Sequence, residues 1–218
     1  VERKNIFLHL KEHKKTLIPM FGGLIFMALI FYSFSFWAPT MMIRAFNVSL
    51  SEVGLILGLI TIVSSIIGTI LAGSVVDYLR NKNYSDAPVR AAMIAVMLAL
   101  PPIVMLSFVS SEIGAWICIA LYLLFISSFA PLGLLAISGV STGSVKGQAA
   151  AIHAFLMMAF GLSLGPQLTA FFTDFIFADP NLLINSISLS GLIVLPISAF
   201  LFKISLRRYR ESSKKMLV

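Results

Sequence analysis

The sequence predicts an all-α membrane protein with six transmembrane helices, arranged as a 3+3 inverted repeat with both termini cytoplasmic. The first observation is composition: 59% of the 218 residues are hydrophobic, 11% are charged and the mean hydropathy is +0.98. Soluble domains carry about 25% charged residues. The second is a set of uncharged runs, each reaching the roughly 20 residues that a helix needs to cross the hydrocarbon core. These runs are 16–43, 53–76, 91–111, 113–145, 147–173 and 180–202.

Polarity and charge between the runs define element type and orientation. No run alternates between polar and apolar residues as a membrane β-strand does, so helices are expected. Of the 16 Lys and Arg residues, only Arg44 falls outside the N-terminal segment, the second-to-third loop, Lys146 and the C-terminal tail. Basic residues are retained in the cytoplasm, which places both termini there. The net charge of +7 therefore reflects topology, and no nucleic-acid partner is expected.

Two basic segments flank the runs. Residues 1–15 place Ile6, Phe7 and Leu10 among five basic residues, a pattern typical of a helix lying on the membrane surface. We expect this segment to be a cytoplasmic interfacial linker, and residues 207–218 to be a basic cytoplasmic tail. Because the chain begins at Val1 rather than at a methionine, we also expect a preceding part of the polypeptide.

Two pairs of short segments indicate internal repetition. GTILAGSVVD (68–77) and GPQLTAFFTD (165–174) share a first Gly, a Leu three residues later and an Asp nine residues later. SFWAP (35–39) has a counterpart in SFAP (128–131). The predicted repeats are 16–111 and 112–206, and because three helices is an odd number they must enter the membrane from opposite sides. The alternative is chance similarity between apolar helices.

The stretch GSVVDYLRNK (73–82) resembles the loop signature Gly-x-x-x-Asp-x-x-Arg, which joins the second and third helices of each half of a major facilitator superfamily transporter. FWAPTMMIRAFNVSLSEVGLILGLI, VKGQAAAIHAF and GLSLGPQLTAFFTD resemble the C-terminal half of its spinster-like and organic-anion branches. Tyr78, Asn81 and Lys146 depart from the usual residues. The resemblance implies one half of a twelve-helix fold, with an N-terminal six-helix half of the same polypeptide as partner.

The resemblance also implies a cytoplasmic gate at Gly73, Asp77 and Arg80. The helix dipole disfavours an acid at the C-terminal end of the second helix, so Asp77 must gain stabilising contacts from other groups. Arg80 lies one turn on, and Gly73 one turn back lets another helix approach closely. By family comparison, Asp77 faces a helix N-terminus of the other half when the cytoplasmic side is closed. The alternative is that Asp77 and Arg80 only anchor a loop.

Polar residues in the first, fourth and fifth runs are candidates for a substrate pathway. In the first run, Ser33, Trp37 and Thr40 share one face by their spacing, and Tyr32 is adjacent. An aromatic belt at the membrane interface explains Trp37 and Thr40 equally well. The full candidate set adds residues from the later runs: Tyr122, Ser128 and Gln167.

Four residues predict helix bends suited to alternating access. Pro39 and Pro131 interrupt the first and fourth helices at positions related by the repeat, and each removes a backbone hydrogen bond. Gly165 and Pro166 permit close packing and a kink in the fifth helix. A purely structural kink remains the alternative reading.

His153 is the only ionisable side chain inside any run, which suggests function by default. It lies six residues beyond Gly147, only ~9 Å from that end of a helix. A rim histidine bonded to backbone and a proton or anion ligand are both consistent with this depth. Cys118 is a single cysteine, so neither a disulfide nor a metal site is predicted, and no cofactor is expected.

The expected function is transport of a small organic solute, anionic or amphiphilic, by secondary active or facilitated alternating access. The expected location is the bacterial inner membrane or a plasma membrane, with membrane lipid and the solute as further partners. A six-helix scaffold or channel-like subunit is the alternative, although the helices are too apolar for a wide aqueous pore. An enzyme is not expected, because a lone His153 supplies no paired nucleophile, base or metal ligand at depth.

Overall fold

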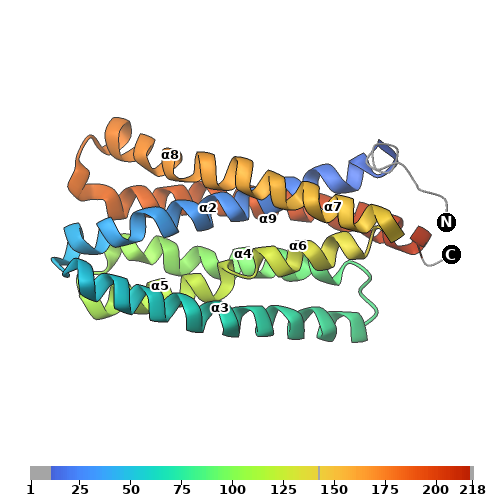
Figure 1. Cartoon of the computed structure of the whole chain (residues 1–218), viewed down its shortest axis with the longest axis horizontal. Coiled ribbons are helices and arrows are strands. Elements are labelled where there is room, and N and C mark those ends of the chain that lie inside the picture. Colours follow the sequence, from blue (N-terminus) through green and yellow to red (C-terminus); the bar gives the residue numbers. More distant parts are fainter. Residues whose placement is uncertain (1–10, 142, 217–218) are drawn as a thin grey trace.

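The computed structural model describes residues 11–141 and 143–216, and the predicted surface helix at Ile6, Phe7 and Leu10 lies outside them. The described part contains six helical spans long and apolar enough to cross a membrane, which confirms the expected number (Figure 1). The spans are α2 (Lys14–Phe46); α3 (Leu50–Asn81); α4 with η1 (Ala87–Met105, Leu106–Phe108); α5 with α6 (Glu112–Ile126, Phe129–Ser138); α7, η2, α8 and η3 (Gly143–Leu156, Met157–Leu162, Ser163–Phe171, Phe172–Phe177); and η4 with α9 (Pro180–Leu182, Leu183–Met216).

The spans alternate in direction along the bundle. Both chain ends lie at one end of the bundle, together with the α3–α4 and α6–α7 connections (Figure 1). The α2–α3, α4–α5 and α8–α9 connections lie at the opposite end, where Arg44 donates to the Pro180 carbonyl over 3.2 Å. The second three spans therefore enter the bundle from the end opposite to the first three. Whether the two triplets superpose as repeats stays a prediction.

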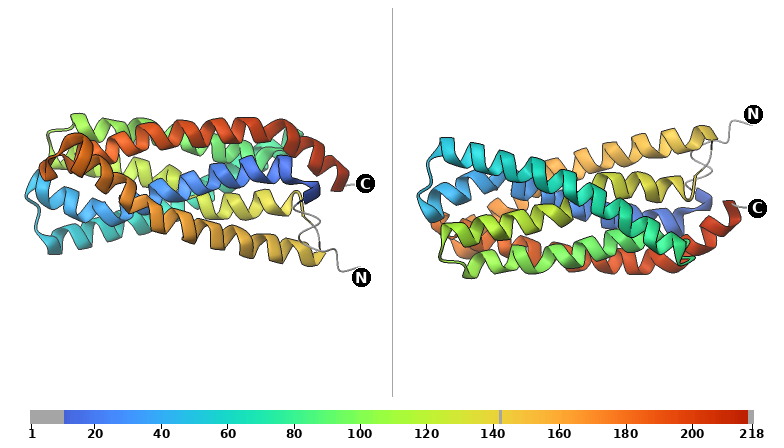
Figure 2. Two further views of the ribbon diagram at one scale, coloured as in Figure 1. Left: turned by 90° about the horizontal axis from the view of Figure 1, so that it is seen from above. Right: turned by 90° about the horizontal axis from the view of Figure 1, so that it is seen from below.

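The first span forms the centre of the packing. Helix α2 lies along α9 and also contacts α8, and it buries Met27, Ile30, Phe34 and Met41 completely (Figure 2). Helix α4 packs between α9 and α5, while α3 packs on α5 and α4. In α3 only 11% of the most apolar 18-residue window is buried, against 61% in α2. The bundle thus has a buried side around α2 and an open side along α3.

Local signals set the sharp turn between α2 and α3. Asn47 caps α2 in the left-handed conformation, with φ of 56°, and donates its backbone N–H to the Ile43 carbonyl. Ser49 then opens α3 with a capping box: its Oγ accepts from the Glu52 backbone N–H, and the Glu52 carboxylate accepts from the Ser49 backbone N–H. The end of α2 and the start of α3 are therefore both capped by residues of the three-residue connection 47–49, which allows the turn to be this short.

Prolines coincide with the irregularities in the fourth and fifth spans. Pro131 lacks an N–H and its ring crowds the carbonyl of Ser127, and the break between α5 and α6 lies at Ser127 and Ser128. Pro166 has the same relation to Leu162, where the π-helical segment η2 ends. Pro39, in contrast, lies inside a continuous α2. Two of the three proline positions predicted as bends therefore lie where regular α-helix is interrupted.

Candidate functional site

A chain of hydroxyl groups joins three spans at the middle of the bundle. Ser33 of α2 lies 2.7 Å from the Thr169 hydroxyl of α8, which lies 2.9 Å from the Ser190 hydroxyl of α9. Ser190 in turn donates to the Ser186 carbonyl over 2.8 Å. All these hydroxyls are buried. The chain can hold the three helices together, because a polar group in an apolar interior must find a partner.

Glycines in the fifth span allow this approach. An added Cβ on Gly165 would collide with the Leu29 carbonyl of α2 and lie 3.0 Å from the Ser33 nitrogen. A Cβ on Gly161 would lie 2.9 Å from the Ala28 Cβ. The two glycines are four residues apart and form a small-residue stripe on one face of the helix. Helix α2 is thus the helix that packs closely against Gly165, and the bending role of Gly165 stays a prediction.

Trp37 lies at the same contact between α2 and α8, here named the α2–α8 seam. Its indole Nε1 donates to the Pro166 carbonyl over 2.9 Å, and the ring remains partly exposed. Tyr32 and Thr40 are also half-buried, while Gln167 is exposed on α8. These four residues and Ser33 all belong to α2 and α8, so five of the eight predicted pathway residues come from two helices in contact. Of these, Ser33 alone is fully buried.

Two other predicted pathway residues lie inside the bundle. Tyr122 has no exposed surface; its hydroxyl donates to the Ile30 carbonyl over 3.1 Å, and its ring centroid lies 4.8 Å from that of Phe34. Ser128 is also buried and donates to the Phe125 carbonyl over 2.8 Å, at the α5–α6 break. In this structure both hydroxyls donate to backbone carbonyls of the bundle.

His153 is buried against α2 and α6, with 3% of its surface exposed. Its ring centroid lies 6.1 Å from that of Phe21, and its Nε2 faces Gly133, where an added Cβ would collide with the imidazole. Within the described residues, Nε2 is one of two buried side-chain polar atoms without a hydrogen-bond partner, the other being the Ser127 hydroxyl. The sequence did not predict this enclosure, because Gly133 had no visible role.

The predicted gate residues lie on the open side of the bundle. Gly73 has no atom within 4 Å of an added Cβ, and both Asp77 and Arg80 are exposed. Their spacing of four and three places all three on one face of α3. No ion pair joins Asp77 to Arg80 among residues 11–141 and 143–216. The bundle itself therefore leaves this face free.

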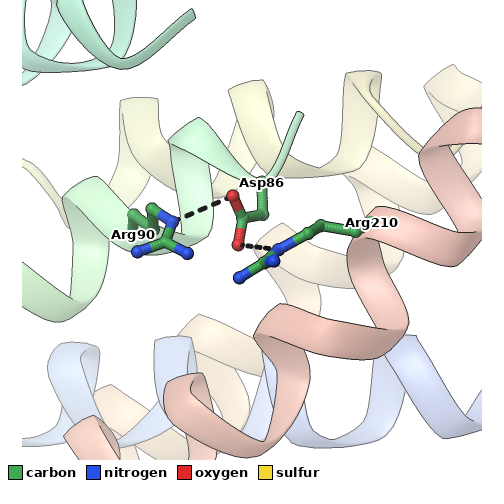
Figure 3. A network of polar contacts seen from close by, with 3 residues as sticks. All are labelled: Asp86, Arg90 and Arg210. Carbon is green, nitrogen blue, oxygen red and sulfur yellow. Dashed lines mark hydrogen bonds and ion pairs between the residues drawn. The ribbon is translucent and has the colours of Figure 1, made fainter. Parts of the chain in front are cut away.

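One charged cluster was not anticipated from the sequence. Asp86, in the α3–α4 connection, is fully buried and accepts from Arg90 Nε over 2.9 Å and from Arg210 Nε of α9 over 2.8 Å (Figure 3). One residue before Arg210, Tyr209 is also buried and donates its hydroxyl to the Ala136 carbonyl over 2.7 Å. Asp86 lies in a loop between two uncharged runs, where an acid is ordinarily exposed to water, so the sequence did not single it out. The i, i+4 spacing of Asp86 and Arg90 was the available signal.

The chemistry available at these sites is that of hydrogen bonding and apolar packing. No group of three His, Cys, Asp or Glu residues able to hold a metal ion occurs in the part of the chain that the structure describes. Cys118 is buried and unpaired. Aromatic, hydroxyl and amide groups on α2 and α8 supply hydrogen bonds and apolar surface.

Comparisons with known proteins identify the fold. No protein-family profile matches the sequence, and no curated protein matches it. Solved structures do match, among them two of a bacterial homologue of the human lysosomal transporter Spinster in an inward-facing conformation. The occupied form has a TM-score of 0.64 at 14% identity, covering 92% of this chain and 49% of that one. The unoccupied form has a TM-score of 0.64 at 14% identity, covering 97% and 50%.

The chain thus spans about half the length of the solved proteins that it resembles. The matched proteins are described as transporters, and the likeness at this identity is one of fold. The six long apolar helices have the fold of about half of that transporter, as expected from the charge-free runs.

Proposed function

We propose that this chain is the C-terminal six-helix half of a transporter that moves a small organic solute across a membrane by alternating access. The observation that carries the proposal is the likeness of all six spans to one half of an inward-facing transporter. In such folds two bundles rock around a central site. Secondary active and facilitated transport are both compatible with this proposal.

The partner in this proposal is the N-terminal six-helix half of the same polypeptide. The two spans with the least buried residues are α3, with 11% of its apolar window buried, and the span of α7 and α8, with 28%. Exposed surface on α3 includes the face of Gly73, Asp77 and Arg80, and Gly73 leaves space for a close helix contact. Docking of the second half on these two spans would cover that surface and enclose a pathway.

The solute pathway in this proposal runs along the partly exposed side chains of α2 and α8. Tyr32, Trp37, Thr40 and Gln167 present aromatic and hydrogen-bonding groups there, and Trp37 is held by its bond to Pro166. No acid or base belongs to this group. An amphiphilic or anionic organic solute is accordingly proposed, with any charged contact supplied by the other half.

The proposed topology places both termini in the cytoplasm, in a bacterial inner membrane or a plasma membrane. It is supported by the basic residues that gather at the bundle end carrying both termini, whereas Arg44 lies at the other end. Single-cysteine variants at Lys82 and at Asn47 test it in the Cys118→Ser background. A membrane-impermeant maleimide added to intact cells should label the Asn47 variant and spare the Lys82 variant; the reverse pattern would overturn the topology.

Ligand-dependent stability tests the function. The full natural chain in detergent is heated with lysolipids, sphingoid phosphates, sugar acids or small carboxylates, since a ligand that binds the folded state raises its stability. A saturable shift with one class is expected, and uptake of that compound into proteoliposomes should follow. No stability shift with any of these compounds, together with no uptake, would contradict transport and favour a scaffold role.

A further inference from the structure

An apolar groove opens between α3 and α4 on the outer surface of the bundle. Residues 68–75 of α3, 91–98 of α4 and 124–128 at the α5–α6 break enclose a cavity of about 150 Å³, here named the α3–α4 groove. Leu71, Ile94 and Leu98 border it and are 46%, 36% and 47% exposed, so it is open toward the membrane. It is separate from the α2–α8 seam described above.

The lining of the α3–α4 groove is almost entirely hydrocarbon. Ser128 supplies the one hydroxyl in the lining, and that hydroxyl is already bonded to the Phe125 carbonyl. Water in a cavity needs two to four polar partners, and apolar cavities of this size stay dry. The occupant that suits such a lining inside a bilayer is an acyl chain.

Helical periodicity carries both walls of the groove to cations at one end. Lys82 follows Val75 by seven residues on the α3 wall, and Arg90 precedes Ile94 by four residues on the α4 wall. Each cation is held by an aromatic ring: Lys82 Nζ lies 4.6 Å from the ring centroid of Tyr78, and Arg90 Cζ lies 4.5 Å from that of Tyr84. Apolar walls thus end in an aromatic and basic rim.

The Asp86 network leaves part of the Arg90 charge available. Asp86 accepts from Nε of both Arg90 and Arg210 (Figure 3), and these two contacts use one nitrogen of each guanidinium group. The side chains of these arginines are 25% and 46% exposed. Two arginines share the one Asp86 carboxylate, and Lys82 adds a third cation, so the rim has an excess of positive charge. Guanidinium Nη atoms are well suited to phosphate oxygens.

We propose that the α3–α4 groove binds an anionic phospholipid, with one acyl chain in the groove and the phosphate at Lys82 and Arg90. The basic rim matches the negatively charged phosphate of such a lipid, and the apolar lining matches its acyl chain. A free phosphate would leave the groove empty, and a neutral lipid would leave the rim charge unmatched. The site is on the α3 face away from Gly73 and Asp77, so it does not depend on the proposed transport function.

Native mass spectrometry of the full natural chain tests the site with dioleoyl phosphatidylglycerol and dioleoyl phosphatidylcholine. We expect tighter retention of phosphatidylglycerol, and a fivefold loss of that preference in Lys82→Gln, since each surface cation near anionic lipid is worth about this factor. Lys146→Gln is the matched control: an exposed lysine at the same bundle end, on α7. Equal losses in both variants would indicate general surface charge and overturn the site.

The groove itself is tested with Ala72→Phe, which adds a ring from a half-buried position in its wall. This variant should bind phosphatidylglycerol at least fivefold more weakly at an unchanged melting temperature. Glycerol phosphate, which lacks acyl chains, should not displace the lipid at millimolar concentration. Unaltered lipid binding in both Ala72→Phe and Lys82→Gln, or full displacement by glycerol phosphate, would refute the proposal.

Discussion

Helices α2 and α3 are 33 and 32 residues long and both strongly apolar, yet α2 is the most buried span and α3 the least. The difference follows from small residues and hydroxyls rather than from apolar content. Gly165 and Gly161 bring α8 against α2, and Ser33 bonds to Thr169. In α3, Gly68 alone of four glycines meets another helix, at the Leu124 backbone, and Gly54, Gly58 and Gly73 have no neighbour. Lipid offers no hydrophobic drive for helices to associate, so close packing and hydrogen bonds decide which helix is central.

The largest expected effect is at the closest contact of α2. Gly165→Ala should destabilise the folded protein by about 3 kcal/mol, because the new Cβ collides with the Leu29 carbonyl and backbone must move. Gly58→Ala in α3, where no atom lies within 4 Å of the added Cβ, should cause no loss. Reversible unfolding in mixed micelles measures both. Similar losses would break the comparison, by showing α3 packed as tightly as α2.

The next effect concerns the connection after α3. Asp86→Asn should cost about 2 kcal/mol, less than a fully buried ion pair because both arginine partners are partly exposed. Glu211→Gln, which removes the exposed Arg207–Glu211 pair at 3.4 Å, is the control and should have no measurable effect on the same unfolding curve. If Asp86→Asn were as harmless, the network would not fix this end of the bundle.

Removing one hydroxyl sharpens the comparison further. Thr169→Val keeps the side-chain shape but breaks both bonds of the hydroxyl chain, and should cost about 1 kcal/mol. Thr61→Val in α3 removes a hydroxyl that donates only to Leu57 of its own helix, and should be close to neutral. Thermal unfolding of the pair gives the difference, and an inverted order would count against hydroxyl bonding as the cause.

The smallest effect on stability is expected at the open face of α3. Asp77→Asn removes an exposed, unpaired acid and should leave the melting temperature unchanged. If Asp77 holds one transport state closed, the same variant should increase labelling of a cysteine in the cytoplasmic cavity. Unchanged stability together with unchanged labelling would favour a loop anchor over a gate.

The sequence predicted the membrane helices well because a run without charge is a sufficient signal for a span. It did not predict which face of each helix is buried, since runs that are apolar all round carry no amphipathic pattern. Tyr122 is an example: its polarity suggested a pathway residue, but its hydroxyl donates to the Ile30 carbonyl inside the bundle. Ser198 and Ser188 similarly bond across helices, to Gly23 and Ile103, where spacing alone allows a bond within the helix.

The loop acid Asp86 was overlooked for a different reason. Hydropathy places it outside every span, and its two partners are 4 and 124 residues away in sequence. Only the folded arrangement brings Arg210 of α9 to the α3–α4 connection. Long-range pairs of this kind leave no local pattern, whereas Pro131 and Pro166 marked two irregular segments because a missing N–H acts within four residues.

The π-helical segment Met157–Leu162 makes the fifth span tolerant of one particular deletion. A π turn holds one residue more than an α turn, so deleting one residue there would restore a regular α-helix. Because the π turn has already absorbed that extra residue, the side chains beyond it would keep their direction relative to those before it. Gly165 and Thr169 would therefore stay in contact with α2, whereas a deletion in the regular helix after the π turn would rotate the side chains that follow it by about 100°. A homologue with a straight fifth helix should therefore align to this chain with a one-residue gap at this turn.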